Sequence, residues 1–509
     1  MAAWFAGDFE GCIESCDAAR RRDPATMRTF ALLKSRALLR LDRPGEALRA
    51  LEPFAYPADD EESLTARMLT GSALVRCGRL DEGLALLRQA QRDGRRSHST
   101  IRSEIALNVA LAHYAKCEFR QAEDALSDVD VGADIVHARA LEYGGWIASA
   151  RGENERATDR FLSALERLDR CKHYDRFLEA NCLRKLAHLA VERLDRATWR
   201  TIEERQSRLD WSASGLAWPR FWIAYCSATY AADVDGDVLR AAKAARVAQR
   251  IAPNPVTQVQ ALCRRASILR CAGEVYAPRD HADDAAALFD ACGATDLDGD
   301  DAMAPLLLAE EFAHLGRYEE SAARLGQFVM HPPTSHVASA TSEPSTAAHQ
   351  RYVEGTLHEC AQDLAAAKRA YGEAIQMYAR IGFKRRAVMA ALRLAHLTGD
   401  AALYDYASAE TSHLAPQSWI RRTIAAASER PVQLTKTQQE IVALICQGKS
   451  TPEIAQARGR SEFTIRNHLT KIFERLGVNT REEVAVEAVL RGYWRPLRRD
   501  SRATGGATV

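Results

Sequence analysis

Apolar residues recur at intervals of three and four along almost the whole chain, which is the spacing of amphipathic helices. The alternation of apolar and polar positions that marks a half-buried strand is hard to find. Alanine, leucine and arginine dominate up to about residue 427, and the few prolines stand between the helical segments. The pattern predicts an all-α protein built from many helices.

The helical segments resemble one another at a regular interval. Each copy starts with a turn residue, usually carries an apolar residue two positions later, and has a small residue five positions later. The clear copies are GDFEGC (7–12), DRPGEA (42–47), GRLDEG (78–83), CEFRQA (117–122) and GENERA (152–157). Looser copies are ERLDRA (192–197), GDVLRA (236–241), DHADDA (280–285), GRYEES (316–321) and QDLAAA (362–367). Successive copies begin 35 to 46 residues apart.

Each copy has the features of the turn in a helical hairpin, where a small residue lets two helix backbones approach closely. One hairpin cannot bury its apolar face alone, so hairpins stack into a superhelix with a concave surface. The early G-x-[FYL]-x-x-[small] copies are similar to the tetratricopeptide repeat, and the resemblance covers most of residues 1–400. We therefore expect an alpha-solenoid that is tetratricopeptide-like. A plain helical bundle is the alternative.

Two segments interrupt this pattern and set the domain boundaries. HPPTSHVASATSEPSTAAHQ (331–350) has no periodicity and predicts a mobile loop, either disordered or a binding loop. SERPVQ (428–433) breaks the helices. We therefore predict the array over residues 1–427, a second domain over 428–494, and a disordered basic tail over 495–509.

The second domain reads as four short helices, each opened by an N-cap signal. The signals are Thr435 with Gln438, Ser450 with Glu453, Ser461 alone, and Thr480 with Glu483. A short second helix, a tight turn at Gly459 and a longer third helix form the sequence pattern of a helix-turn-helix. In such a module the N-terminal half of the second of these helices lies in the DNA major groove.

The third helix of the domain has side chains that suit base reading. Arg466, Asn467 and Thr470 lie on one face, away from the apolar positions 465, 469, 472 and 476. Arg pairs with guanine, Asn with adenine, and Thr meets a base edge or a thymine methyl. The surrounding basic residues suit phosphate contacts: Lys449, Arg458, Arg460, Lys471, Arg475 and Arg481.

The segment from Leu434 to Ala488 resembles the LuxR/FixJ/GerE-type DNA-binding domain of bacterial transcription regulators. Its matching positions include Glu453-Ile454-Ala455, Thr464-Ile465-Arg466 and Leu476-Gly477-Val478. The resemblance implies promoter DNA and RNA polymerase as partners and a homodimer on DNA. It implies these site residues: Arg466, Asn467 and Thr470 for bases; Thr464, Lys471 and Arg481 for phosphates; Val484, Ala488 and Arg491 in the dimer helix. The chain departs from the family at Thr437-Gln438, which replace an Arg-Glu pair, and at Arg458 and Arg460, which replace apolar residues.

Composition and the absence of certain motifs argue against several other classes of protein. Sixty-nine Lys and Arg balance 68 Asp and Glu, so any nucleic-acid contact is local. The 12 cysteines form no CxxC pair and no grouping at metal-ligand spacing, which predicts a reduced, cytoplasmic protein without metal or cofactor. No apolar run reaches the length of a membrane span. No phosphate loop or nucleophile motif stands out, so an enzyme is not expected.

These observations predict a transcription regulator in which the array senses or docks a protein, a peptide or a small effector. The alternative is an interaction scaffold whose C-terminal domain binds protein rather than DNA.

Overall fold

The computed structural model describes residues 2–22, 27–52, 60–132, 134–274, 276–293, 297, 299–330, 344–428 and 434–491. Within these residues every regular element is a helix, as the sequence predicts. None of the described helices is long and apolar enough to cross a membrane.

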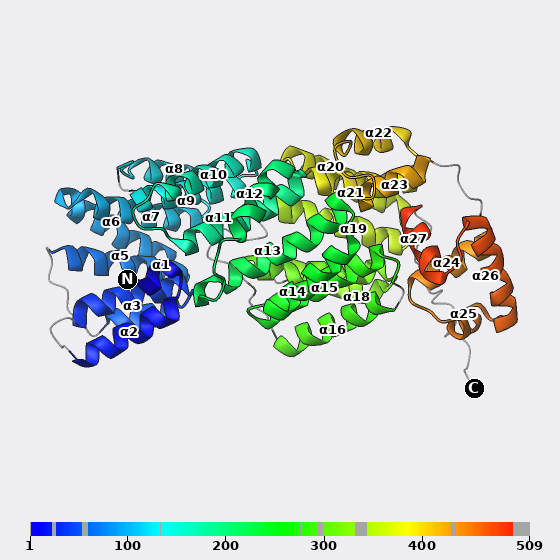
Figure 1. Ribbon diagram of the computed structural model, residues 1–509, viewed down its shortest axis with the longest axis horizontal. Helices are drawn as coiled ribbons and strands as arrows, with labels where there is room; N and C mark the ends of the chain where they lie inside the picture. The colour runs from blue at the N-terminus through cyan, green and yellow to red at the C-terminus, as the bar shows by residue number, and fades with distance from the viewer. Residues whose placement is uncertain are drawn as a thin grey trace.

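The helices run as antiparallel neighbours along an elongated array, which ends in a separate four-helix domain (Figure 1). The first half of the array contains α1 (Ala2–Ala6), α2 (Phe9–Arg22), α3 (Met27–Arg40), α4 (Pro44–Leu51), α5 (Glu61–Arg76), α6 (Leu80–Asp93), α7 (Ser99–Ala115), α8 (Phe119–Ser127), α9 (Asp134–Ala150), α10 (Asn154–Asp169), α11 (Arg176–Arg193) and α12 (Arg196–Gln206).

The second half contains α13 (Ala217–Tyr230), the π-helical turn η4 (Ala231–Asp235), α14 (Val238–Ile251), α15 (Pro255–Cys271), α16 (Ala277–Cys292), α17 (Ala304–His314), α18 (Tyr318–Met330), α19 (Pro344–Cys360), α20 (Leu364–Arg380), α21 (Lys384–Thr398), α22 (Ala401–Glu410) and α23 (Trp419–Ser428). The C-terminal domain contains α24 (Lys436–Cys446), α25 (Thr451–Arg458), α26 (Glu462–Leu476) and α27 (Arg481–Leu490).

The turns of the hairpins explain the repeated sequence pattern. The opening residue has a positive φ in eight of the ten copies: Gly7, Asp42, Gly78, Cys117, Gly152, Gly236, Gly316 and Gln362. A left-handed residue reverses the chain, and the next helix begins two positions later. The small residue of the pattern is fully buried at Ala47, Ala122, Ala157, Ala241, Ser321 and Ala367. The predicted solenoid of helical hairpins is confirmed.

Two of the looser copies are shifted. In ERLDRA the left-handed residue is Leu194 rather than the opener Glu192, and the buried residue five positions later is Trp199. DHADDA lies inside α16, so its prediction as a turn is wrong. The actual turn is at Gly273, whose φ is +88°. Ala285 is buried as predicted, but because α16 packs through it in mid-helix.

The predicted loop over residues 331–350 needs a correction. Residues 344–350 form the first two turns of α19, and Thr346, Ala348 and His349 are buried there. Because these buried side chains are small or polar, the hydrophobic pattern of the sequence does not show that they face the core. Residues 331–343 lie outside the described residues, as do 429–433 and the predicted tail.

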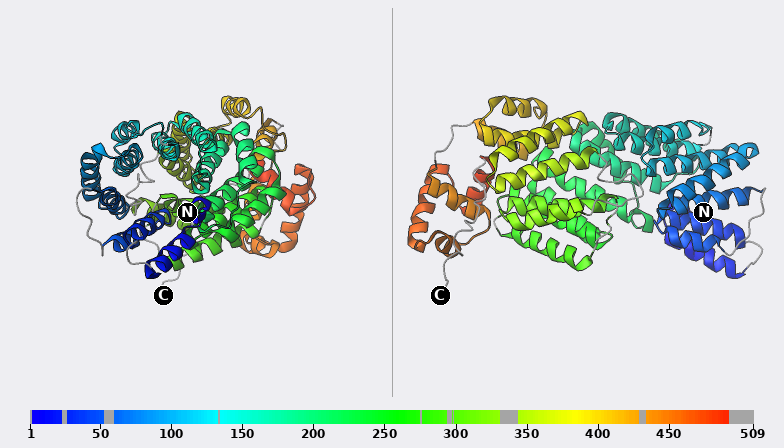
Figure 2. Two further views of the ribbon diagram at one scale, coloured as in Figure 1. Left: turned by 60° about the vertical axis from the view of Figure 1, so that its left-hand side comes forward. Right: turned by 180° about the vertical axis from the view of Figure 1, so that it is seen from behind.

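The array turns as it progresses, so that helices distant in sequence come into contact (Figures 1 and 2). The Gly215 N–H donates to the Gly7 carbonyl over 2.9 Å, and the rings of Phe9 and Phe177 lie 5.1 Å apart. Further along, the Asn154 side-chain amide donates to the carbonyl of Ile381 over 2.9 Å. The superhelix therefore closes on itself instead of leaving each hairpin in contact with its neighbours alone.

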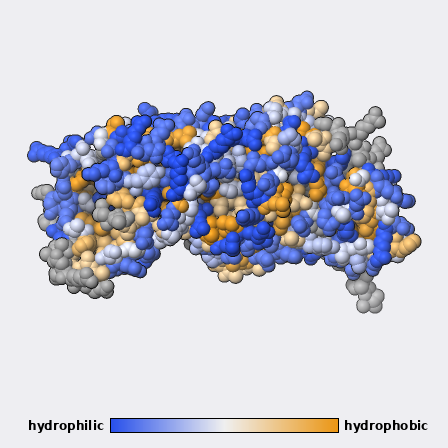
Figure 3. Space-filling model, viewed as in Figure 1, coloured by the Kyte–Doolittle hydropathy of each residue, from blue (hydrophilic) through white to orange (hydrophobic). Residues whose placement is uncertain are grey.

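The array and the C-terminal domain have separate cores. The largest cluster of buried apolar residues extends from α9 to α23, whereas a second cluster is confined to α24–α27 and their caps. On the face seen in Figure 3, apolar residues form patches over the array between broad hydrophilic areas. The C-terminal domain is thus a compact unit attached to the end of the array.

Candidate nucleic-acid interface

The helices of the C-terminal domain begin where their cap residues predict. The Thr435 hydroxyl accepts the Gln438 N–H over 3.3 Å, and the Gln438 side chain accepts the Thr435 N–H over 3.0 Å. Ser450 and Glu453 form a second reciprocal box. Thr480 and Glu483 exchange the same pair of bonds at α27, and Ser461 caps α26. Each cap satisfies backbone N–H groups that a helix leaves without partners, so the short helices have defined starts.

The turn between α25 and α26 gives the helix-turn-helix its geometry. Gly459 has a φ of +58°, and the Arg460 N–H donates to the Ala455 carbonyl over 3.0 Å, which ends α25 in a left-handed cap. α26 then packs its predicted apolar stripe into the domain core through Ile465, Leu469, Ile472 and Leu476. The predicted helix-turn-helix is confirmed, and its packing fixes which face of α26 points outward.

The outward face of α26 carries the three residues predicted to read bases. Arg466, Asn467 and Thr470 are all exposed. The Arg466 guanidinium lies 3.2 Å from the Glu462 carboxylate, and the Thr470 hydroxyl donates to the Arg466 carbonyl over 3.2 Å. Lys471 is exposed beside them. α26 lies along the outer side of the domain, away from the array (Figure 1). The face is therefore open to a partner.

Sequence reasoning missed Phe463 on the first turn of the same helix. Phe463 is 74% exposed, more than the exposed tyrosines Tyr174 and Tyr276. An exposed phenylalanine beside the positions predicted to read bases suits a contact with a thymine methyl. The signal was present in the sequence, because position 463 falls outside the buried stripe 465, 469, 472 and 476.

The residues predicted to contact phosphate fall into two groups. Lys471 and Arg460 are exposed, and neither side chain has a hydrogen bond or ion pair to the described part of the chain. The others already bind within the domain. Their partners are Ser461 for Thr464, Glu453 for Lys449, Gln438 for Arg475, and Thr451 and the Lys449 carbonyl for Arg481. Arg458 is likewise paired with Glu440. Lys471 and Arg460 are thus the better placed for phosphate.

The predicted dimer helix α27 faces two ways. Val484 and Ala488 are fully buried in the core of the C-terminal domain, and the Arg491 guanidinium is held 2.7 Å from Glu487. The other side of α27 contacts the array, where Val486 and Leu490 pack with Trp419, Ala426 and Cys271. The predicted dimer contact stays a prediction, because the outward side of this helix is occupied by the array.

Comparison with known proteins places these features in a family. A family model described as bacterial regulatory proteins, luxR family, matches residues 432–488. The spore germination protein GerE of Bacillus subtilis (strain 168) is 41% identical over 59 residues, which are 12% of this chain and 80% of the relative. The match covers α24 to α27 almost completely.

Similar solved structures are distant. The crystal structure of Rap protein complexed with competence and sporulation factor matches 68% of this chain and all of its own, with 13% identity and a TM-score of 0.41. The APC/C hetero-tetramer Cut9–Hcn1 matches 96% of this chain and 94% of its own, with 11% identity and a TM-score of 0.29. The hairpin turns and the packing of the helices define the fold of the array.

Proposed function

The chain belongs to the luxR family of bacterial regulatory proteins, and we propose that it regulates transcription by reading promoter DNA with α26 in the major groove. This family consists of regulatory proteins and is not an enzyme family. The observation that carries the proposal is the exposed face of α26. It presents Arg466, Asn467 and Thr470 together, opposite a fully packed apolar stripe.

The chemistry of that face suits direct readout. Arg466 has donors for the O6 and N7 of guanine, and Asn467 has the donor and acceptor for the N7 and N6 of adenine. Binding a base would require Arg466 to leave Glu462, an exposed partner whose ion pair costs little to break. Lys471 and Arg460 flank the face and are available for phosphates, which position a reading helix on the duplex.

The contact between α27 and the array supports a role for the array as the input. A homodimer formed through the outward side of α27 would have to displace Val486 and Leu490 from the array. A ligand or partner that loosens this contact would free the helix. A dimer would then bind two half-sites about 10 base pairs apart or a multiple of that spacing.

The experiment is selection of duplexes from a random DNA pool by the full-length protein, followed by affinity measurements across a salt series. Arg466→Ala and Asn467→Ala should each lose about 1–3 kcal/mol on the selected sequence and relax preference at one base position. Lys471→Ala should weaken all sequences alike and make the salt slope shallower.

Lys243→Ala is the matched control, because Lys243 is an exposed lysine on α14 of the array. It should leave both affinity and salt slope unchanged. If neither the full-length protein nor a fragment of residues 428–509 enriches any sequence, or if Arg466→Ala and Asn467→Ala bind as well as the unaltered protein, the scaffold alternative holds and the C-terminal domain binds protein rather than DNA.

A further inference from the structure

The second half of the array encloses a cavity whose lining is unusually polar. It is lined by residues of α13, η4, α15, α17, α19, α20 and α21. The charged residues on its wall are Arg264, Arg385, Arg386, Asp233, Glu310 and Glu311. Three cations thus face three acidic side chains, so the lining itself suits an occupant without net charge.

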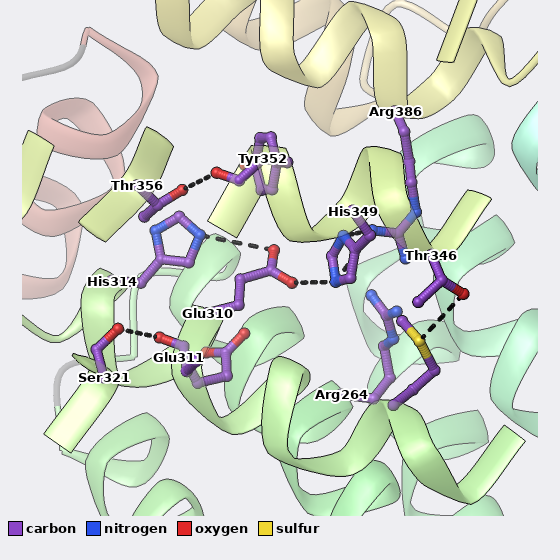
Figure 4. Close-up of polar contacts among 12 residues, drawn as sticks. Arg264, Glu310, Glu311, His314, Ser321, Thr346, His349, Tyr352, Thr356 and Arg386 are labelled. Atoms are coloured by element: carbon purple, nitrogen blue, oxygen red, sulfur yellow. Dashed lines mark hydrogen bonds and ion pairs between the residues drawn. The ribbon is translucent and has the colours of Figure 1, made fainter. Parts of the chain in front are cut away.

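Most of these charges are already paired with one another or with residues just behind the wall. Arg385 donates to Asp233 over 2.9 Å and to Glu192 over 2.7 Å. Figure 4 shows the Glu310 carboxylate between the imidazole rings of His314 and His349, with Arg386 on the far side of His349. Burial lowers the pKa of His349 to about 4, so its neutral ring accepts from Arg386 and donates to Glu310.

Two opposite charges on the wall, Arg264 and Glu311, are only partly compensated. The Arg264 guanidinium donates to the Tyr225 hydroxyl over 3.0 Å, but no carboxylate of the described residues lies within ion-pair distance of it. Its buried Nε has no hydrogen-bond partner. Glu311 is only 4% exposed, its Oε1 lies 3.4 Å from Arg270, and its buried Oε2 has no partner. Buried charged groups are normally satisfied, so these two mark where a ligand of complementary charge gains most.

We propose that this cavity binds a small zwitterion of the amino-acid type, its carboxylate at Arg264 and its ammonium group at Glu311. Such a molecule supplies an acceptor to the unpaired cation and a donor to the unpaired carboxylate oxygen while adding no net charge. Its side chain would lie against the remaining wall, which is formed by Leu307, Met389 and the rings of Tyr225, Tyr352 and Tyr378.

The protonation of Glu311 fits this assignment. Burial raises the pKa of Glu311 to about 7, although the neighbouring Arg270 and Arg264 oppose the rise. An ammonium group beside it would favour the charged carboxylate, as a nearby opposite charge does in general. A simple anion at Arg264 alone would leave the Glu311 oxygen without a donor.

The cavity wall is continuous with the contact that holds the C-terminal domain. Cys271 lines the cavity and also packs against the cluster that contains Val486 and Leu490 of α27. Two residues further on, the Glu482 carbonyl and the Val486 side chain lie against Gly273. If the proposed function holds, this zwitterion is the effector of the array. Its binding would shift the C-terminal end of α15, which α27 contacts.

The test is a thermal-shift and titration series on the full-length protein without DNA. Each standard α-amino acid is compared with its own amide, which keeps the ammonium group and lacks the carboxylate. We expect at least one amino acid to raise the melting temperature and its amide to fail. Arg264→Gln and Glu311→Gln should each weaken that amino acid roughly tenfold to a hundredfold, as loss of a charged hydrogen-bond partner does.

Arg265→Gln is the matched control, because Arg265 follows on the same helix but contacts Gln249 and does not line the cavity. It should bind as the unaltered protein does. The proposal is overturned if no amino acid raises the melting temperature, or if the amides or inorganic phosphate do so equally. The comparison between amino acid and amide uses the unaltered protein, so it remains informative even if a variant fails to fold. Because no DNA is present, a failure here leaves the base-reading role of α26 standing.

Discussion

The array and the C-terminal domain use arginine in opposite ways. In the array, Arg385 and Arg393 are buried and Arg386 is half-buried, and the three are bound to Glu192, Asp233 and Glu359 inside the superhelix. In the C-terminal domain, Arg460 and Arg466 lie on the surface at and beside α26. Although the total charge is balanced, the arginines of the array form ion pairs between distant helices, whereas those of the C-terminal domain are exposed to solvent.

Buried and exposed arginines differ in their effects on stability and on the attraction of charged partners. A buried cation held by two carboxylates fixes the position of helices, and removing one partner leaves the others uncompensated in a medium of low dielectric constant. An exposed cation has little effect on stability but attracts a polyanion at long range. The two regions should therefore respond to charge removal in different assays.

The largest effect is expected from Arg385→Ala, which tests the buried network. Its removal leaves Glu192 and Asp233 facing each other in the interior, where the Arg385 side chain is only 6% exposed. We expect the free energy of unfolding of the array to fall by about 3–5 kcal/mol in urea denaturation. Arg208→Ala removes the exposed pair with Glu204 and should cost at most about 1 kcal/mol. Equal losses would show that burial does not distinguish the two pairs.

The next effect concerns the junction of the two regions. An alanine at position 273 would place its Cβ 2.4 Å from Val486 and 2.7 Å from the Glu482 carbonyl, at a φ of +88°. We expect Gly273→Ala to detach α27 and to speed amide hydrogen exchange in that helix. Gly293→Ala is the control, because Gly293 has a φ of +56° and no neighbour within 4 Å. It carries a backbone cost of about 1–2 kcal/mol without the clash. If both variants leave α27 protected, Gly273 does not govern the contact.

The smallest effect is expected within the C-terminal domain, at the cap of α25. Ser450→Ala should lower the stability of this domain by about 1 kcal/mol, as loss of an N-cap does.

Hydrogen bonds from the Ser450 backbone and hydroxyl lower the pKa of Glu453 from 4.5 to about 2. A lowered folded-state pKa stabilises the domain above pH 4.5, and that contribution disappears as the pH falls towards 2. The difference in melting temperature between the unaltered protein and Glu453→Gln should shrink across this window. A difference that is constant with pH would exclude the linkage.

The sequence was sufficient wherever the determinant is local. The cap boxes at Thr435, Ser450 and Thr480 and the stripe of α26 are set by residues three or four positions apart, and each is confirmed. The same holds for the turns of the array, where one left-handed residue and one small residue define a hairpin. DHADDA failed because alanines inside a helix can imitate the small residue of a turn.

Other features depend on residues far apart in the chain and could not be predicted. Arg385 and Glu192 are separated by 193 positions, and each looks like an ordinary surface charge of an amphipathic helix. The cavity is lined by residues of seven elements, so no local sequence motif predicts it. The contact of α27 with the array likewise joins two domains whose patterns are each complete alone. The assignment of single residues to bases and phosphates is still a prediction.

The closure of the superhelix has a consequence for how the array comes apart. In an open solenoid each hairpin touches only its neighbours, so terminal hairpins can fray while the middle stays folded. Here the first hairpin is bonded to residue 215, α10 is bonded to the end of α20, and α11 is bonded to the start of α21. Loss of the first hairpin would break contacts with residues more than 200 positions further along the chain. We therefore expect the array to melt as one cooperative unit, with no stepwise loss of hairpins from its ends.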